Sequence, residues 1–404
     1  MKSTKTIIIL SFFVMLSTCQ GSVKTGLDCV GTYKEVFQGK RLGIITNHTA
    51  YNSNGEYIVD VLRSLTGVTV TALFSPEHGL WGKDQAGEKL NSHIDPVYNL
   101  PVYSLYGQAL KPTREMLQGI DVLVFDIQDI GARFYTYIYT MALSMEAAAK
   151  NSKTFVVLDR PNPINGYCVE GNVLEKGLAS FVGLYPIPVR HGMTVGELAK
   201  MFNEQGWLGG GVKANLVVIP MEGWHRRMWY DQTGLNFIKP SPNMPDLETA
   251  VIYPGLCLLE GTNVSEGRGT KRPFRQFGAP WIDSKRFADR LNELGLPGMY
   301  FEPVSFTPAS SKYQGQICNG VRIIITERDQ LEPFYSGVRI VNEVYRMYPR
   351  DFQWQARHFD RLCGTLTIRD AITSQSSLNR LSSDWQVELQ SFQKIRDKYL
   401  IYPD

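Results

Sequence analysis

Ionisable and polar residues gather directly after several short apolar runs in the first half of the chain. Glu77 and His78 follow the run Val68–Phe74, and Asp126 follows the run Asp121–Phe125. A carboxylate near a histidine or an arginine suits general acid–base catalysis, because such neighbours separate the pKa values of carboxyl groups around neutral pH. Glu77, His78 and Asp126 are therefore the predicted catalytic residues.

Two other apolar runs, Arg41–Thr46 and Thr154–Leu158, also end in polar clusters, and segments 189–194 and 260–270 could close over them. A single cluster could be an ordinary turn, since Asp, Asn and Pro are common turn residues. Four clusters together, with glutamate, histidine and arginine among them, indicate one polar cleft rich in carboxylates. The predicted binding residues are Asn47, Gln128, Asp129, Arg133, Arg160, Asn162, Arg190, His191, Glu260, Asn263, Glu266 and Arg268.

The same segments lack the patterns of the common cofactor and metal sites. Loop 260–270 does not contain the G-x-x-x-x-G-K-[ST] pattern of a phosphate loop, and no apolar run leads into G-x-G-x-x-G. His48, His78 and His191 could form a metal site with carboxylates, but no H-x-H or H-E-x-x-H spacing supports it. We therefore predict no cofactor and no metal, with metal catalysis as the weaker alternative.

The apolar runs predict the elements that position these residues. They are short and rich in β-branched residues, as expected of strands covered on both faces in a parallel sheet. Stretches with a helical pattern lie between them, so the alternation predicts an α/β fold with a Rossmann-like open parallel sheet. Ligands of such sheets bind beyond the carboxyl ends of the strands. The predicted strands are Arg41–Thr46, Val68–Phe74, Asp121–Phe125, Thr154–Leu158 and Asn215–Ile219, and the predicted helices are Gly55–Leu65, Pro112–Gln118, Tyr135–Lys150 and Thr194–Gln205, the last with a capping-box pattern.

The chain of 404 residues exceeds the ~250–300 residues that one core usually spans, so two domains are expected. The proline-rich segment Ser241–Pro245 is predicted as a linker or loop, and Tyr253–Pro280 as a long irregular stretch. Val321–Thr326 is predicted as a strand and Leu331–Tyr348 as an amphipathic helix. We predict a Rossmann-like catalytic domain at residues 23–240 and a smaller α+β domain at residues 241–404 that closes the cleft.

Residues 1–22 have the pattern of an export signal. Lys2 and Lys5 precede the apolar segment Ile7–Leu16, which is too short to span a bilayer as a helix. The tetrapeptide LSTC that ends at Cys19 resembles a bacterial lipobox, which predicts a lipid on Cys19 and a protein anchored in the periplasm or cell envelope. Cleavage by an ordinary signal peptidase is the alternative, because Thr18 stands where Gly or Ala is usual.

The composition argues against nucleic acid as a partner. Lys and Arg number 42 against 39 Asp and Glu, a net charge of +3, and no long basic run occurs. Aromatic residues make up 11% of the chain, and aromatic platforms beside carboxylates, Asn and Arg are typical of carbohydrate sites. The cysteines beyond the leader have no C-x-x-C spacing, which favours unpaired buried thiols and leaves one disulfide open. They are Cys29, Cys168, Cys257, Cys318 and Cys363.

These motifs resemble those of the bacterial exo-β-N-acetylmuramidases, glycoside hydrolase family 171, formerly a domain of unknown function. The resemblance runs from about residue 25 to the C-terminus. It implies a Rossmann-like N-terminal domain, a smaller C-terminal domain, a cleft between them, and release of N-acetylmuramic acid from non-reducing ends of peptidoglycan fragments. The matching stretches are Leu42–Asn47, Ser75–Gly79, Phe125–Arg133, Asp159–Pro163, Val189–Thr194 and Glu260–Thr270.

With this substrate in view, the chemistry assigns roles to the candidates. Glu77 is the predicted general acid/base and His78 tunes or orients it, while Asp126 is the second carboxylate or orients the N-acetyl group. The lactyl carboxylate of the sugar is expected to pair with Arg190 or Arg268. The alternative is a non-catalytic surface lipoprotein that binds muropeptides or other glycans; an esterase or amidase is disfavoured because no G-x-S-x-G pattern occurs.

Overall fold

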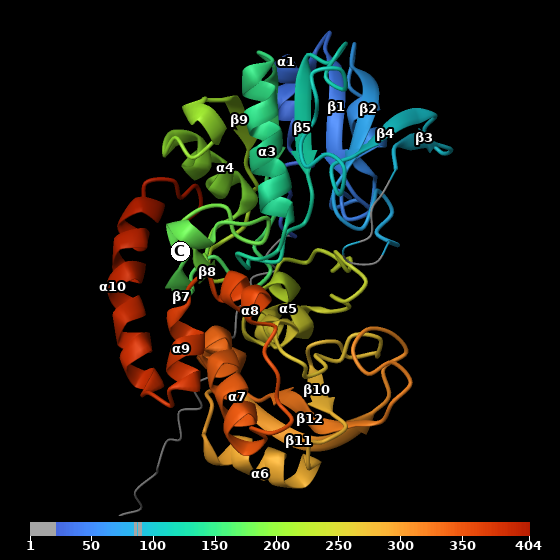
Figure 1. Cartoon of the computed structure of the whole chain (residues 1–404). Helices are drawn as coiled ribbons and strands as arrows, with labels where there is room; N and C mark the ends of the chain where they lie inside the picture. Colours follow the sequence, from blue (N-terminus) through green and yellow to red (C-terminus); the bar gives the residue numbers. More distant parts are fainter. Residues whose placement is uncertain (1–21, 85–86, 88–90) are drawn as a thin grey trace, which may run out of the picture.

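The computed structural model describes residues 22–84, 87 and 91–404 of the chain (Figure 1). Apart from Ser22, the predicted export signal with Cys19 lies outside these described residues. In the described part of the chain, no helix is both long enough and apolar enough to cross a membrane.

A seven-stranded sheet with the order β3-β4-β2-β1-β5-β6-β9 forms the first unit. All neighbouring strands are parallel except β3 and β4, which confirms the predicted α/β fold with an open, mostly parallel sheet. The five predicted strands are present, whereas β3 and β4 were not predicted. The strands are β1 Arg41–Thr46, β2 Thr69–Ser75, β3 His93–Asp95, β4 Leu100–Ser104, β5 Val122–Asp126, β6 Thr154–Leu158 and β9 Asn215–Ile219.

Alternate side chains of each parallel strand enter two different cores. Leu42 and Ile44 of β1 belong to the core that contains residues of α2, whereas Ile45 belongs to the core that contains residues of α3 and α4. Helices therefore cover both faces of the sheet, which is why its strands are continuous apolar runs. The helices of this unit are α1 Lys34–Phe37, α2 Ile58–Arg63, α3 Tyr137–Lys150 and α4 Val195–Glu204, and α4 begins with the predicted capping box of Thr194 and Glu197.

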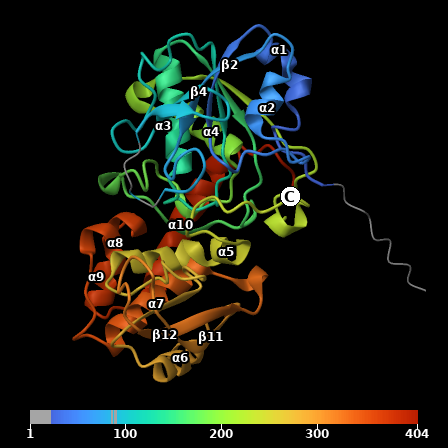
Figure 2. The same ribbon diagram turned by 90° about the vertical axis from the view of Figure 1, so that its right-hand side faces the viewer.

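The second unit is smaller and lies below the sheet in Figures 1 and 2, with α5 and α8 at the junction. Its antiparallel sheet has the order β10-β12-β11. Helices α5 and α7 approach closely where Gly255 of α5 faces Gly337 of α7. The approach requires glycine, since a Cβ at Gly255 would lie 1.8 Å from the carbonyl oxygen of Pro333. The elements are α5 Leu247–Leu256, β10 Gln276–Ala279, α6 Ser284–Glu293, β11 Met299–Phe306, β12 Cys318–Ile325, α7 Pro333–Met347, α8 Ala356–Cys363 and α9 Thr367–Thr373.

Two predictions of local structure are wrong. Residues 112–118 do not form the predicted helix and consist mainly of turns. The stretch Tyr253–Pro280, predicted as irregular, contains the end of α5, the 3-10 helix Cys257–Gly261 and β10. Helix α5 is buried from Thr249 to Leu256, so it has no polar face that would reveal a helical pattern.

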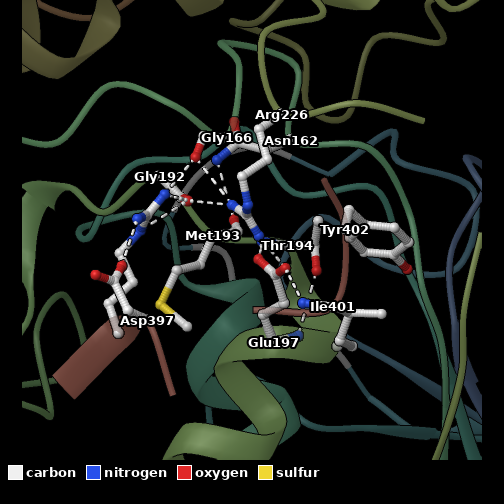
Figure 3. A network of polar contacts seen from close by, with 12 residues as sticks. Asn162, Gly166, Gly192, Met193, Thr194, Glu197, Arg226, Asp397, Ile401 and Tyr402 are labelled. Carbon is white, nitrogen blue, oxygen red and sulfur yellow. Dashed lines mark hydrogen bonds and ion pairs between the residues drawn. The ribbon is translucent and has the colours of Figure 1, made fainter. Parts of the chain in front are cut away.

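The C-terminal segment returns to the first unit. Helix α10 (Leu378–Arg396) packs against β7 (Glu170–Val173), which pairs with β8 (Pro188–Arg190). Figure 3 shows how the residues beyond α10 are held: the Ile401 amide donates to Glu197, which forms a buried ion pair with Arg226. The C-terminal segment therefore ties the two units together. A single division at residue 240 assigns this segment to the second unit, although it packs against the first.

Candidate active site

A cavity of about 300 Å³ lies at the junction of the two units. The first unit contributes the turn after β2 and the segment that leads into α3, and the second contributes loop 260–270 and α8. The cavity thus lies beyond the carboxyl end of a parallel strand, as expected of an open α/β sheet. The polar residues that line it are Glu77, His78, Tyr106, Tyr135, Thr136, Tyr137, Ser241, Asn243, Tyr253, Glu260, Arg268 and His358.

Glu77 is placed in the cavity by a tight turn. The Gly79 amide donates to the Pro76 carbonyl at 3.1 Å, and His78 in between has a φ of 70°, in the left-handed region. This conformation is costly for a residue other than glycine and is maintained by surrounding contacts. The Nδ1–H of His78 donates to the Asp84 carbonyl oxygen at 2.8 Å. His78 therefore ties the turn that carries Glu77 to the segment at Asp84, and its orienting role toward Glu77 stays a prediction.

The opposite wall of the cavity carries a network of charges. An Nη2 of Arg268 donates to Oε1 of Glu260 at 2.5 Å, and its Nε lies 3.3 Å from Oε1 of Glu266. Nε2 of His358 lies 3.6 Å from Oε2 of Glu260, and Lys312 pairs with Glu266 at 3.0 Å. Burial alone would raise the pKa of Glu260, but Arg268 and His358 outweigh it and lower the pKa to about 2. Glu260 therefore remains ionised at neutral pH.

Asp126 lies elsewhere and already has a partner. It is fully buried at the end of β5 and forms a two-point ion pair with Arg160, in which Nη2 and Oδ2 are 2.9 Å apart. Burial raises the pKa of Asp126 despite the opposing charge of Arg160. Asp126 is not among the described residues that line the Glu77 cavity. The structure thus separates two predicted catalytic carboxylates, and its geometry favours a structural ion pair for Asp126.

Four of the predicted binding residues shape the loops at the strand ends. Asn47, Asp129 and Asn162 each accept a hydrogen bond from the backbone amide two residues later, at 2.7–3.1 Å. These are Asx turns, in which the side chain accepts a hydrogen bond from a backbone amide of its own loop. Gln128 donates to the Pro161 carbonyl at 2.8 Å and so joins two of the loops. Burial raises the pKa of Asp129 to about 7.

Arg133 joins the two units. Its guanidinium is fully buried and donates to four backbone carbonyl oxygens at 2.6–3.1 Å. Burial lowers the pKa of Arg133 to about 10. The acceptors are Asn172, Ile187, Leu362 and Cys363, so the side chain links the β7–β8 region to the end of α8.

The remaining predicted binding residues also lie outside the Glu77 cavity. Arg190 packs over the ring of Trp229, 5.5 Å from its centroid, and lines a separate cavity of about 1000 Å³ beside α10. Burial, followed by the charges of nearby arginines, lowers the pKa of His191 to about 3. Asn263 bonds to the backbone of Asp351 and Gln353. Of the predicted site residues, those that line the Glu77 cavity in the described structure are therefore Glu77, His78, Glu260 and Arg268.

The sequence analysis missed several residues of this cavity. Thr136, which donates to Glu77, falls inside the predicted helix Tyr135–Lys150, and its residue type gives no sign of a role in the cavity. His358 lies on α8, a helix that was not predicted, and no motif pointed to it. Within the described residues, no group of three or more His, Cys, Asp or Glu could hold a metal ion.

Comparison with known proteins agrees with this two-unit arrangement. Residues 42–248 match the family model described as exo-beta-N-acetylmuramidase NamZ, N-terminal, and residues 251–402 match its C-terminal counterpart. The chain is 48% identical over 382 residues to peptidoglycan beta-N-acetylmuramidase NamZ of Bacillus subtilis (strain 168), covering 94% of this chain and 91% of that protein.

Two crystal structures of DUF1343 family proteins from Bacteroides fragilis NCTC 9343 have the same fold. One has a TM-score of 0.87 at 38% identity, covering 94% of this chain and 99% of that chain. The other has a TM-score of 0.76 at 30% identity, covering 95% of this chain and 100% of that chain. With both family models matched in order across the two units, the chain belongs to the exo-β-N-acetylmuramidase NamZ family.

Proposed function

We propose that this protein is a glycoside hydrolase that releases N-acetylmuramic acid from the non-reducing ends of peptidoglycan fragments. The observation that carries the proposal is the cavity in which Glu77 of the first unit and Arg268 of the second lie together. A carboxyl group can transfer the proton in glycoside hydrolysis, and a guanidinium can pair with the carboxylate of an acidic sugar. The family and the name of the B. subtilis relative support the same activity.

The size of the cavity supports action at chain ends. Its volume of about 300 Å³ is at the lower end of the ~300–1,000 Å³ range of small-molecule sites. Aromatic side chains from both units, Tyr106 and Tyr253 among them, offer faces against which a sugar ring can pack. A cavity of this size suits one terminal sugar residue rather than an extended glycan.

In the proposed mechanism, Glu77 is the general acid/base of the reaction. The transition state of glycoside hydrolysis resembles an oxocarbenium ion and carries positive charge on the sugar ring. Glu260 is the carboxylate that shares the cavity with Glu77 and remains ionised, so it is better placed than Asp126 to counter that charge. Asp126 receives no role with substrate in this proposal.

The direct test is hydrolysis of a chromogenic β-N-acetylmuramide beside the matching N-acetylglucosaminide. We expect phenol release from the muramide alone, and the same rate after treatment with a chelator. Tight binding of the muramide without release would contradict the proposal and support a glycan-binding lipoprotein. Loss of activity after treatment with the chelator would instead support the alternative of metal catalysis.

Replacing Arg268 with Lys should weaken binding of N-acetylmuramic acid about tenfold or more, because a lysine cannot reproduce the forked guanidinium contact with a carboxylate. Binding of N-acetylglucosamine, which lacks the lactyl group, should change little. Calorimetric titration with both sugars measures the difference. Arg272→Lys is the matched control, because Arg272 lies two residues beyond loop 260–270 and outside the described cavity lining. Equal loss for both sugars in Arg268→Lys, or selective loss in Arg190→Lys instead, would refute the assignment.

We also propose that the protein is exported and anchored through a lipid on Cys19. The proposal rests on the basic residues Lys2 and Lys5, the apolar segment Ile7–Leu16 and the lipobox-like LSTC. Metabolic labelling with an alkyne fatty acid should mark the wild-type protein and not Cys19→Ala. Export of an unlabelled, shortened protein would favour ordinary signal-peptidase cleavage.

A further inference from the structure

Thr136 occupies the N-cap position of α3 but does not cap the helix. A threonine at this position usually has an extended backbone and accepts a hydrogen bond from an amide of the first helical turn. Thr136 instead has φ −72° and ψ −14°, and its hydroxyl accepts no capping bond from the described chain. Thr194 of α4 provides the contrast, since its side chain accepts from the Glu197 amide in a complete capping box. The Thr136 hydroxyl is therefore used for something other than helix formation.

That hydroxyl points to Glu77. Oγ1 of Thr136 lies 2.8 Å from Oε2 of Glu77 and must be the donor when the carboxyl group is ionised. The Gly87 amide donates to the other oxygen, Oε1, at 3.2 Å. Tyr106 lines the same cavity, and burial, followed by the charge of Glu77, raises the pKa of Tyr106. Both oxygens of Glu77 are thus held by hydrogen bonds, which come from two separate segments of the first unit.

We propose that Thr136 is a positioning residue that fixes the Glu77 carboxyl group for proton transfer, at the expense of the cap of α3. The inference rests on the proposed role of Glu77. A hydrogen bond to an ionised carboxylate is roughly twice as strong as one between neutral groups, which favours the Glu77 contact over the helix cap. Local rules of helix formation are broken chiefly at functional sites, where another gain compensates. The compensation here is a single orientation of the Glu77 side chain in the cavity.

The test compares Thr136→Val and Thr136→Ser with a control on the same helix. Thr136→Val keeps the shape but removes the donor, so kcat on the chromogenic muramide should fall about ten- to hundredfold, the size expected for a misplaced catalytic group. KM should stay within about twofold, because Thr136 is not assigned to sugar binding. Thr136→Ser retains the donor and should recover most of kcat. The thermal midpoint of Thr136→Val should be unchanged, since no helix cap is lost.

Thr140→Val is the matched control: Thr140 lies one turn further along α3, and within the described part of the chain its hydroxyl donates to the Thr136 carbonyl, at 3.5 Å. It should leave kcat unchanged. The pH–rate profile adds a readout that a purely structural role would not move: the limb that depends on Glu77 should shift in Thr136→Val alone. The other titratable groups of the described cavity are His78, Tyr106, Tyr135, Tyr137, Tyr253, Cys257, Glu260, Arg268 and His358.

Wild-type kcat and pH profile in Thr136→Val, beside an inactive Glu77→Gln, would overturn the inference while leaving the proposed function intact. Parallel loss of thermal midpoint and kcat that serine does not rescue would also overturn it, in favour of a structural hydroxyl. Full activity of Glu77→Gln would refute the proposed role of Glu77 itself.

Discussion

A Glu77→Gln enzyme should hydrolyse a chromogenic β-N-acetylmuramide at least about a hundredfold more slowly than the wild type, because general acid–base catalysis contributes ~10²–10⁴-fold. Glutamine has nearly the same shape and its amide oxygen can still accept a hydrogen bond from Thr136. It cannot give or take the proton. The loss should therefore appear in kcat, with the thermal midpoint of unfolding unchanged.

Varying the leaving group separates proton donation from other roles of Glu77. A more acidic phenol departs without protonation, so the deficit of Glu77→Gln should shrink as the pKa of the phenol falls. Glu222→Gln, an exposed glutamate paired with Lys24, is the control and should keep wild-type turnover. Near-normal turnover of Glu77→Gln would end the assignment. A lower thermal midpoint would instead indicate that Glu77 is a structural carboxylate.

Breaking the Asp126–Arg160 pair should destabilise the protein by about 3–5 kcal/mol, the usual cost of leaving one partner of a buried ion pair without the other. Asp126→Asn leaves the Arg160 guanidinium buried at 4% exposure, with the Tyr51 carbonyl as its other acceptor. The thermal midpoint should fall by several degrees. Activity measured well below the new midpoint should remain close to that of the wild type.

A double variant distinguishes this structural role from catalysis. Replacing both partners with apolar residues, as in Asp126→Leu with Arg160→Met, removes the uncompensated charge and is often neutral for stability. We therefore expect the double variant to recover much of the thermal midpoint lost in Asp126→Asn. Lost turnover in Asp126→Asn at an unchanged midpoint would contradict the structural role and return Asp126 to the catalytic residues.

The parallel sheet was predictable because its physical requirements are local. Strands covered by helices on both faces must be apolar along their whole length, so β1, β6 and β9 are visible in the sequence with their bounds. The capping box of Thr194 and Glu197 is equally local. Helix α5 was missed for the opposite reason, since complete burial removes the polar face on which helix recognition depends.

For the candidate site, the sequence by itself determined which segments carry the chemistry, and only the tertiary structure decided which side chains share a cavity. Polar residues after parallel strands must gather at one edge of the sheet, so the cleft and Glu77 could be predicted. Asp126 looked equivalent to Glu77 until its pairing with Arg160, 34 residues away, was known. Thr136 was one residue of the predicted helix Tyr135–Lys150, and only the folded chain shows its contact with Glu77, 59 residues away. Residue type and spacing describe what a side chain can bind, but its actual partner depends on the direction in which the folded backbone points it.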